Sequence, residues 1–239
     1  GGGLGLVLLF LRISMYESGM FSKLKESKVH RGNFLSLFSS KERFVKYIKC
    51  ILIGVPVWFV IGVLVTLAPE FASIKGLNVI GTILGGKAVM YHYVGASIGA
   101  FLTGIISQYL KSRKKALLIS LFTLSLTMMW YFFATGVSDT LFYFILFLIG
   151  IPNGYWSVFV VTASEQFGTN LRATATTTIP NFVRGATVAV TTAFNYFKSG
   201  SFGILGAGIS VGIIVMALAF YSSFTLEESY HKDLDYYED

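Results

Sequence analysis

The chain has 239 residues, of which 54% are hydrophobic, 16% aromatic and only 13% charged. An ordinary soluble domain has about 25% charged residues, so this composition excludes a typical soluble protein and indicates a membrane protein. The net charge of +7 does not indicate nucleic-acid binding, because no stretch is long and polar enough to form a solvated basic domain. A single cysteine excludes an internal disulfide, and three scattered histidines without a CxxC or HExxH pattern predict neither a metal site nor a cofactor.

Six apolar runs are long enough to cross a bilayer, whose hydrocarbon core requires roughly 20 apolar residues per helix. One of the six is weaker because it contains threonines and Arg184, although small and hydroxyl residues suit a helix that packs against other helices. We therefore predict an all-α polytopic transmembrane helical bundle with six full spans plus the end of a preceding span. The clear runs are near 46–68, 88–110, 115–136, 140–163 and 203–224, and the weaker run covers roughly 175–197.

The opening GGGLGLVLLFL is apolar, but at about 1.5 Å per residue it would reach only about halfway across a membrane. We expect it to be the end of a truncated span; a signal peptide is the alternative, which lacks an initiating Met, a basic leader and a persuasive cleavage site. The predicted domains are a truncated helix (1–12), a cytoplasmic linker (13–45), a six-helix bundle (46–226) and a cytoplasmic acidic tail (227–239).

Two details of the linker and one of the tail can be predicted. Residues 17–28, ESGMFSKLKESK, suit either a short helix at the headgroup surface or a solvated loop. Ser39 and Glu42 have the spacing of a capping box, so the first full helix is expected to start before it enters the lipid. The tail is acidic and polar, and we expect it to be disordered.

Basic residues give the orientation of the spans. Most of the 19 lysines and arginines lie before the first full span or in the turn after the second, and the positive-inside rule places these segments in the cytoplasm. The same rule places the C-terminus in the cytoplasm. We expect an integral protein of a bacterial inner (plasma) membrane, surrounded by membrane lipid.

Three segments together resemble the major facilitator superfamily of transporters, over about residues 4 to 226. LRISMYESGMF (11–21) is similar to the segment after that family's sixth helix, and residues 95–117 resemble its glycine-rich eighth helix and the basic turn that follows. Residues 163–185 resemble the family's E-x-F-P-T-x-x-R-A-T-G segment between helices ten and eleven. The residues that depart from the family pattern are Gly19, Gln108, Ser112 and Gly168.

The resemblance implies the C-terminal half of a secondary active transporter, which would work together with a missing N-terminal six-helix half. It implies that a small polar or organic solute crosses by alternating access, coupled to protons, and that the chain is not an enzyme. A non-transporting membrane receptor or scaffold is the alternative. A polar, water-filled path between the helices would favour transport, whereas a dry interior would favour the receptor or scaffold.

Three charged residues are candidates for a cytoplasmic gate. A charge that faces hydrocarbon costs at least about 2.5 to 3.5 kcal/mol, so Arg184 should face protein, water or a partner charge. Glu165 ends one apolar run, and Arg184 lies inside the next, so antiparallel helices could bring the two together. The resemblance implies that Glu165, Arg172 and Arg184 belong to charge clusters that form and break during transport. Simple marking of the membrane boundary is the alternative.

The candidate substrate-binding residues lie deep within the predicted spans. In the segment PNGYW (152–156), the proline and glycine loosen the helix, while Asn153, Tyr155 and Trp156 offer hydrogen bonds and a stacking surface. Trp58 follows a proline in the first full span, and His92 lies near the non-cytoplasmic entrance of the second. Packing around a kink, or anchoring at the interface, would equally account for these residues.

Overall fold

The computed structural model describes residues 3, 7, 8, 34–73 and 75–238. The predicted linker helix at 17–28 lies outside the described residues, as does nearly all of the predicted truncated span at 1–12. The helices of the bundle lie between Phe34 and Thr225, and the segment after them is described as far as Glu238.

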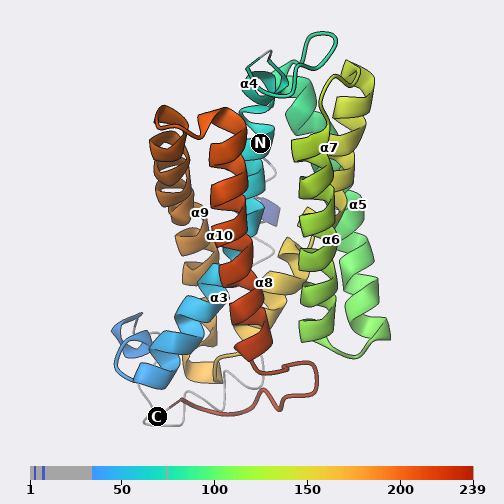
Figure 1. The fold of residues 1–239 in the computed structure, drawn as a ribbon. Coiled ribbons are helices and arrows are strands. Elements are labelled where there is room, and N and C mark those ends of the chain that lie inside the picture. The colour runs from blue at the N-terminus through green and yellow to red at the C-terminus, as the bar shows by residue number, and fades with distance from the viewer. Residues whose placement is uncertain (1–2, 4–6, 9–33, 74, 239) are drawn as a thin grey trace.

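The described residues form a bundle of long helices without named strands, which confirms the predicted all-α polytopic fold (Figure 1). Five helical stretches are long and apolar enough to cross a membrane. In chain order the elements are η1 (Phe34–Leu37), α3 (Lys41–Phe59), η2, a π-helical continuation (Val60–Val65), α4 (Ala68–Ala72), α5 (Gly85–Tyr109), α6 (Arg113–Phe133), α7 (Asp139–Asn153), α8 (Trp156–Glu165), α9 (Thr169–Ser199) and α10 (Gly203–Thr225).

The five membrane-spanning stretches coincide with the five clear apolar runs of the sequence, because helix length and burial in lipid both follow hydropathy. The weaker run lies inside α9, a helix of 31 residues that begins at Thr169. This helix is longer than any of the five but less apolar. Several of its threonine hydroxyls, those of Thr176, Thr177, Thr178 and Thr191, donate to backbone carbonyls of the preceding turn, so these hydroxyls need no partner in lipid.

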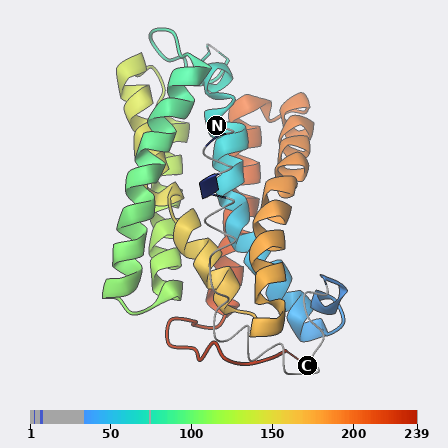
Figure 2. The same ribbon diagram turned by 180° about the vertical axis from the view of Figure 1, so that it is seen from behind.

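The helices stand roughly parallel in two groups (Figures 1 and 2). α3, α9 and α10 pack together on one side, and α5, α6 and α7 on the other. α8 runs obliquely from the end of α7 toward α9 and links the groups. The short α4 lies at one end of the bundle, and the segment after α10 crosses the opposite end.

A seam of glycines lets α5 approach α7 and α8 closely. A Cβ atom on Gly99 would lie 1.7 Å from the Ile151 carbonyl oxygen, and one on Gly150 would lie 2.2 Å from the His92 carbonyl oxygen. Small residues of this kind allow helix backbones to pack directly in a membrane. The consequence for the site is that the backbone of His92 on α5 touches α7 itself.

Prolines shape the two helices that face one another across the bundle. Pro56 lies inside α3, and the helix widens to π geometry from Val60 to Val65. Pro152 lies at the end of α7, and the predicted span near 140–163 divides there into two helices, α7 and α8. Proline cannot donate the helix hydrogen bond, which is consistent with the break after Pro152, whereas Pro180 lies inside α9 without interrupting it.

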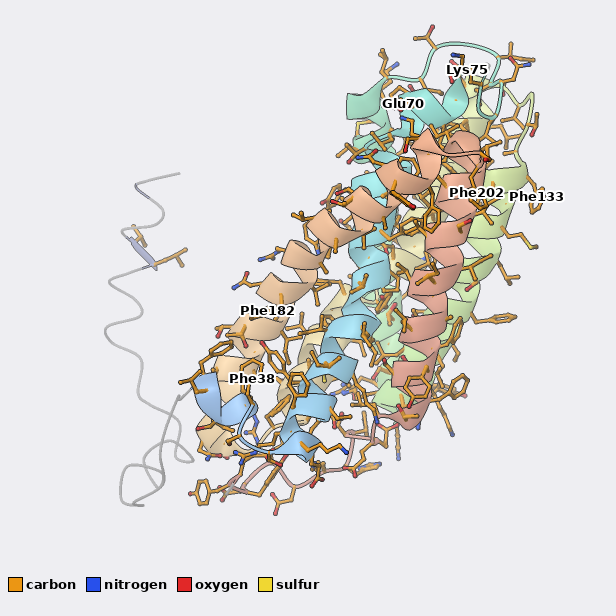
Figure 3. All side chains as sticks on the ribbon, turned by 60° about the vertical axis from the view of Figure 1, so that its left-hand side comes forward. Phe38, Glu70, Lys75, Phe133, Phe182 and Phe202 are labelled. Atoms are coloured by element: carbon orange, nitrogen blue, oxygen red, sulfur yellow. The ribbon has the colours of Figure 1, made fainter. Side chains whose placement is uncertain are left out.

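The predicted capping box at the start of α3 is wrong. Ser40 is the N-cap residue, without a side-chain capping bond, and the Ser39 hydroxyl instead donates to the Ser36 carbonyl at 2.9 Å. The short η1 helix before it packs against α9: the rings of Phe34 and Phe182 stack with centroids 6.1 Å apart. Figure 3 shows Phe182, near the middle of α9, in the same part of the bundle as Phe38 and far from Glu70 and Lys75 at the other end.

Candidate functional site

A cavity of about 380 Å³ lies where α3, η2, α5, the α7–α8 break and α9 meet. It brings together four of the predicted substrate-binding residues, Trp58, His92, Asn153 and Trp156. Arg184, predicted as a gate residue, lines the same cavity. The other lining residues are Val57, Ile61, Tyr93, Ala96, Ser97, Ala100, Gly154 and Ser157.

The cavity lies near the middle of the bundle along its length. Arg184 is at the midpoint of α9, which runs from Thr169 to Ser199. Asn153 lies at the junction of α7 and α8, in the middle of the stretch Asp139–Glu165. In secondary transporters the substrate site typically lies near the bilayer midplane and is formed by interrupted helices, and the break at Gly154 is such an interruption.

His92 and Asn153 form a buried polar pair on the cavity wall. Their side chains are 0% and 2% exposed, and the Asn153 Nδ2 atom lies 3.1 Å from the His92 Nε2 atom. With the amide nitrogen donating, Nε2 accepts and the proton of the neutral imidazole is on Nδ1. The Asn153 Oδ1 atom and the His92 Nδ1 atom are both buried without a hydrogen-bond partner.

Two tryptophans form the apolar part of the wall. The rings of Trp58 and Trp156 meet edge to face, with centroids 6.3 Å apart and an interplanar angle of 81°. The Trp58 Nε1 donor is buried without a partner. The Arg184 guanidinium lies 5.9 Å from the centre of the Trp58 ring, within reach of a cation–π interaction.

Tyr155 does not line the cavity. Its side chain is fully buried, and its hydroxyl donates to the Ile53 carbonyl of α3 at 2.6 Å. The residue sits in the turn between α7 and α8, and its side chain does not enter the cavity that Asn153 and Trp156 line. Its geometry is that of a tie between α8 and α3.

A second polar site, which we name the charged end, comprises Ser107, Arg113, Glu165, Glu228 and Ser229. Arg113 donates from Nη2 to Glu165 Oε1 at 3.2 Å and from Nε to Glu165 Oε2 at 3.3 Å, so the pair is bidentate. The two side chains are only 14% and 12% exposed. Arg113 also donates to the Ser107 hydroxyl at 2.9 Å, and the Ser229 hydroxyl donates to Glu165 at 2.7 Å.

The expected pairing of Glu165 with Arg184 is wrong. Glu165 pairs with Arg113, while Arg184 donates to Asn181 at 3.1 Å and forms no ion pair with any described residue. Between Thr169 and Arg184 the helix rises about 22 Å at about 1.5 Å per residue. Glu165 lies at the end of α8, close in sequence to the start of α9. Because α9 begins before its apolar run, Arg184 lies farther from that start than the apolar run alone suggested.

Arg172 lies at the same end of the bundle as Glu165 but binds backbone carbonyls. It donates to Phe167 at 3.1 Å and to Leu234 at 2.5 Å. Its role therefore differs from that of a charge in an ion pair: it ties the α8–α9 turn to the segment that follows α10.

That segment, residues 227–238, is packed against the protein, contrary to the expected disorder. Asn170 donates to the Glu238 carbonyl at 2.8 Å and accepts from the Glu238 N–H at 2.9 Å. The Glu238 carboxylate accepts from Lys46 at 3.0 Å. The contacts of Glu238 with Asn170 and Lys46 therefore hold the end of this segment against the starts of α9 and α3.

Glu228 caps the start of α6. Its carboxylate accepts from the Arg113 N–H at 2.9 Å, the Lys114 N–H at 3.3 Å and the Ser112 hydroxyl. Burial alone would raise the pKa of Glu228, but the hydrogen bonds from Ser112 and from the backbone N–H groups of Tyr230, Arg113 and Ser229 outweigh it. The net pKa is below the usual value for a glutamate.

Sequence reasoning missed Arg113, Ser107 and Glu228. The signal available for Arg113 was its place in the basic turn after a glycine-rich span, one of the segments that carried the family resemblance. Nothing in the spacing of residues along the chain shows that this turn meets Glu165. Ser107 and Glu228 carry no sequence signal, because each gains its role only from packing.

The fold and the cavity define a polytopic helical membrane protein with a polar site midway along its spans. The chain belongs to the Major Facilitator Superfamily, whose family model matches residues 1–192. Over 102 residues it is 33% identical to organic cation/carnitine transporter 6 of Arabidopsis thaliana, a match that spans 42% of this chain and 19% of the relative. No solved structure matches the chain significantly.

Proposed function

We propose that this chain is the C-terminal half of a secondary active transporter that moves a small organic solute by alternating access. The observation that carries the proposal is the cavity midway along the spans, with polar side chains from α3, α5, the α7–α8 break and α9. Membership of a transporter family supports it. The organic solutes in the name of the Arabidopsis relative support an organic rather than an inorganic substrate.

We propose that a second helical bundle covers the cavity. Thr177, Asn181 and Arg184 follow one another on one face of α9 and are exposed on the surface of this chain, as are Ser97 and Ser157 nearby. A polar face midway along membrane-spanning helices is costly in hydrocarbon. A partner bundle with a water-filled space between the two halves removes that cost, and it is the arrangement that alternating access requires.

The charged end is proposed as the cytoplasmic gate. The basic residues near the start of α3 and the turn before α6 lie at this end, which favours a cytoplasmic location by the positive-inside rule. The bidentate Glu165–Arg113 pair joins the end of α8 to the start of α6. A change in the angle of α8 would separate the two side chains, so the pair favours one of the two states of the transport cycle.

His92 is the proposed proton carrier. It is buried, lines the cavity and shares a hydrogen bond with Asn153 on α7. An imidazole has an unperturbed pKa near neutrality, so a proton gained by His92 from one side of the membrane could be released to the other.

Uptake by the complete transporter, reconstituted in liposomes, tests this proposal. We expect saturable uptake of an organic solute that an imposed proton gradient accelerates. His92→Gln should abolish the acceleration, whereas the matched control His231→Gln, in the tail, should not. Uptake whose rate does not depend on the proton gradient would refute proton coupling but not transport. Absence of uptake under every gradient would favour the receptor or scaffold, and uptake by this chain alone would refute its role as a half.

A further inference from the structure

We infer that the cavity binds an organic anion, namely a small carboxylate with an aromatic or apolar body, and that Arg184 holds its carboxylate. This inference deepens the proposed function, because it names the chemical class of the solute for the same site. It rests on three properties of the cavity: its charge, its unpaired polar atoms and its aromatic wall.

The charge of the cavity is positive and uncompensated. Arg184 is always protonated, and the residues that line the cavity include no aspartate or glutamate. Among the described residues, the Arg184 guanidinium has one hydrogen bond, to Asn181, and no carboxylate within ion-pair distance. A guanidinium has five N–H donors in a planar fork that fits a carboxylate, so most of its binding capacity remains unused.

The unpaired polar atoms make this more than a lone surface charge. Asn153 is 2% exposed, and its Oδ1 atom has no partner; the buried Trp58 Nε1 donor has none either. Buried polar atoms are almost always satisfied in native proteins. Both atoms are closed to solvent, but they belong to side chains that line the cavity beside Arg184, so a rotation of either side chain would present a hydrogen-bonding atom to a polar ligand.

The aromatic wall sets the character of the rest of the ligand. Trp58 and Trp156 present an edge-to-face pair of rings, and Val57, Ile61 and Ala100 complete an apolar surface beside them. Ligand pockets of about 300 to 1,000 Å³ are typical for small molecules, and this cavity of about 380 Å³ is at the lower end. An anion with one ring or a short apolar chain fits both the volume and the surface.

The alternative role for Arg184 is a permanent ion pair with a carboxylate from the partner bundle. Such a pair would leave the cavity neutral and indifferent to the charge of a ligand. The two roles are distinguished by whether the charge at position 184 determines which ligands bind to the complete transporter, in which the partner bundle is present.

Binding can be measured by isothermal titration calorimetry on the complete transporter, purified in detergent. The probes are benzoate, benzamide and benzyltrimethylammonium, which share a phenyl ring and differ in charge.

We expect saturable binding of benzoate at least about tenfold tighter than that of benzamide, because only the anion pairs with a guanidinium. Arg184→Gln should remove this preference, and Arg184→Glu should reverse it in favour of benzyltrimethylammonium. The gain of cation binding cannot result from misfolding. The matched control is Lys198→Gln, a cation at the far end of α9 that pairs with Glu70, which should leave all three affinities unchanged.

The inference is overturned if benzoate does not bind saturably, if benzoate and benzamide bind equally, or if Arg184→Glu leaves the charge preference as it was. These results are independent of transport. Anion binding without gradient-driven uptake would support the anion site but refute the proposed transport function. Uptake of cations or neutral solutes that is unaffected by Arg184→Gln would refute the anion site and leave the transporter intact.

Discussion

The charged end and the midplane cavity contain similar kinds of polar residues, but these residues differ in how many hydrogen-bond and ion-pair partners they have. At the charged end Arg113 has a bidentate carboxylate and a serine hydroxyl as partners, and Glu165 has a second donor in Ser229. In the cavity Arg184 has no carboxylate among the described residues, and Asn153 keeps an unpaired oxygen. One site is satisfied by the protein itself, whereas the other is left for something to bind.

This difference separates stability from function. A polar group whose partners are all within the protein stabilises the fold, and its loss leaves those partners buried without hydrogen bonds. A polar group with unused capacity already costs folding free energy, so its removal costs little. Substitutions at the charged end should therefore lower the stability of the chain, and substitutions in the cavity should lower ligand binding.

The largest effect is expected from Glu165→Gln, which leaves the Arg113 charge nearly buried without a counter-charge. We expect a loss of about 2 to 4 kcal/mol in the free energy of unfolding, seen as a lower thermal midpoint in detergent. The control is Glu227→Gln: its side chain is 80% exposed and 3.8 Å from Lys232, so about 0 to 1 kcal/mol is expected. Equal losses would contradict the comparison.

The same pair can be reversed to identify the partner. Glu165→Arg with Arg113→Glu should recover part of the lost stability, because the geometry of the pair is approximately retained. Glu165→Arg with Arg184→Glu should recover none, because about 22 Å of α9 separates Arg184 from the end at which Glu165 lies. Recovery by the second combination would restore the pairing that the sequence suggested.

Two buried asparagines form the next test. Asn170→Ala removes both hydrogen bonds to Glu238 and should cost about 1 to 3 kcal/mol of stability without changing benzoate binding. Asn153→Ala leaves the buried His92 Nε2 atom without its hydrogen bond, so a similar loss of stability is expected, but this variant should also weaken benzoate binding severalfold. Titration and thermal denaturation of the same samples provide both readings; weaker benzoate binding in Asn170→Ala, or unchanged binding in Asn153→Ala, would refute the division.

Tyr155→Phe should have a smaller effect, confined to stability. The substitution removes the 2.6 Å hydrogen bond from the hydroxyl to the Ile53 carbonyl and leaves the ring in place, so about 1 kcal/mol is expected. Benzoate affinity should be unchanged, because the side chain does not line the cavity. A lower benzoate affinity without a loss of stability would indicate that Tyr155 belongs to the substrate site after all.

The smallest effect concerns pH. Because the folded pKa of Glu228 is below its usual value of 4.5, the ionised carboxylate stabilises the fold above that value, and the contribution is lost as the pH falls through the folded pKa. Glu228→Gln should remove this part of the acid sensitivity. The thermal midpoints of the original protein and of Glu228→Gln should converge between neutral pH and about pH 3. If the two midpoints instead fall in parallel with pH, the ionised Glu228 carboxylate makes no contribution to stability.

The fold was predictable because hydropathy acts along the chain. The length of each apolar run determines a span, and Pro56 and Pro152 mark the helices that bend. Trp58, Asn153 and Trp156 were predicted together with Tyr155 because polar and aromatic side chains deep within spans are few, whereas His92 was predicted near the non-cytoplasmic entrance. The start of α9 was not predictable to the same precision, because its first turn is polar and lies before the apolar run.

The sequence by itself determined the number, length and membrane character of the helices, and it identified the residue types that could form a site. Only the tertiary structure decided the partners. It joined Glu165 to Arg113 rather than Arg184, turned Tyr155 toward α3, and packed the acidic tail against basic helix ends. The physical reason is that apolar burial depends on composition summed over many residues, whereas a hydrogen bond depends on the position of two atoms within about 3 Å.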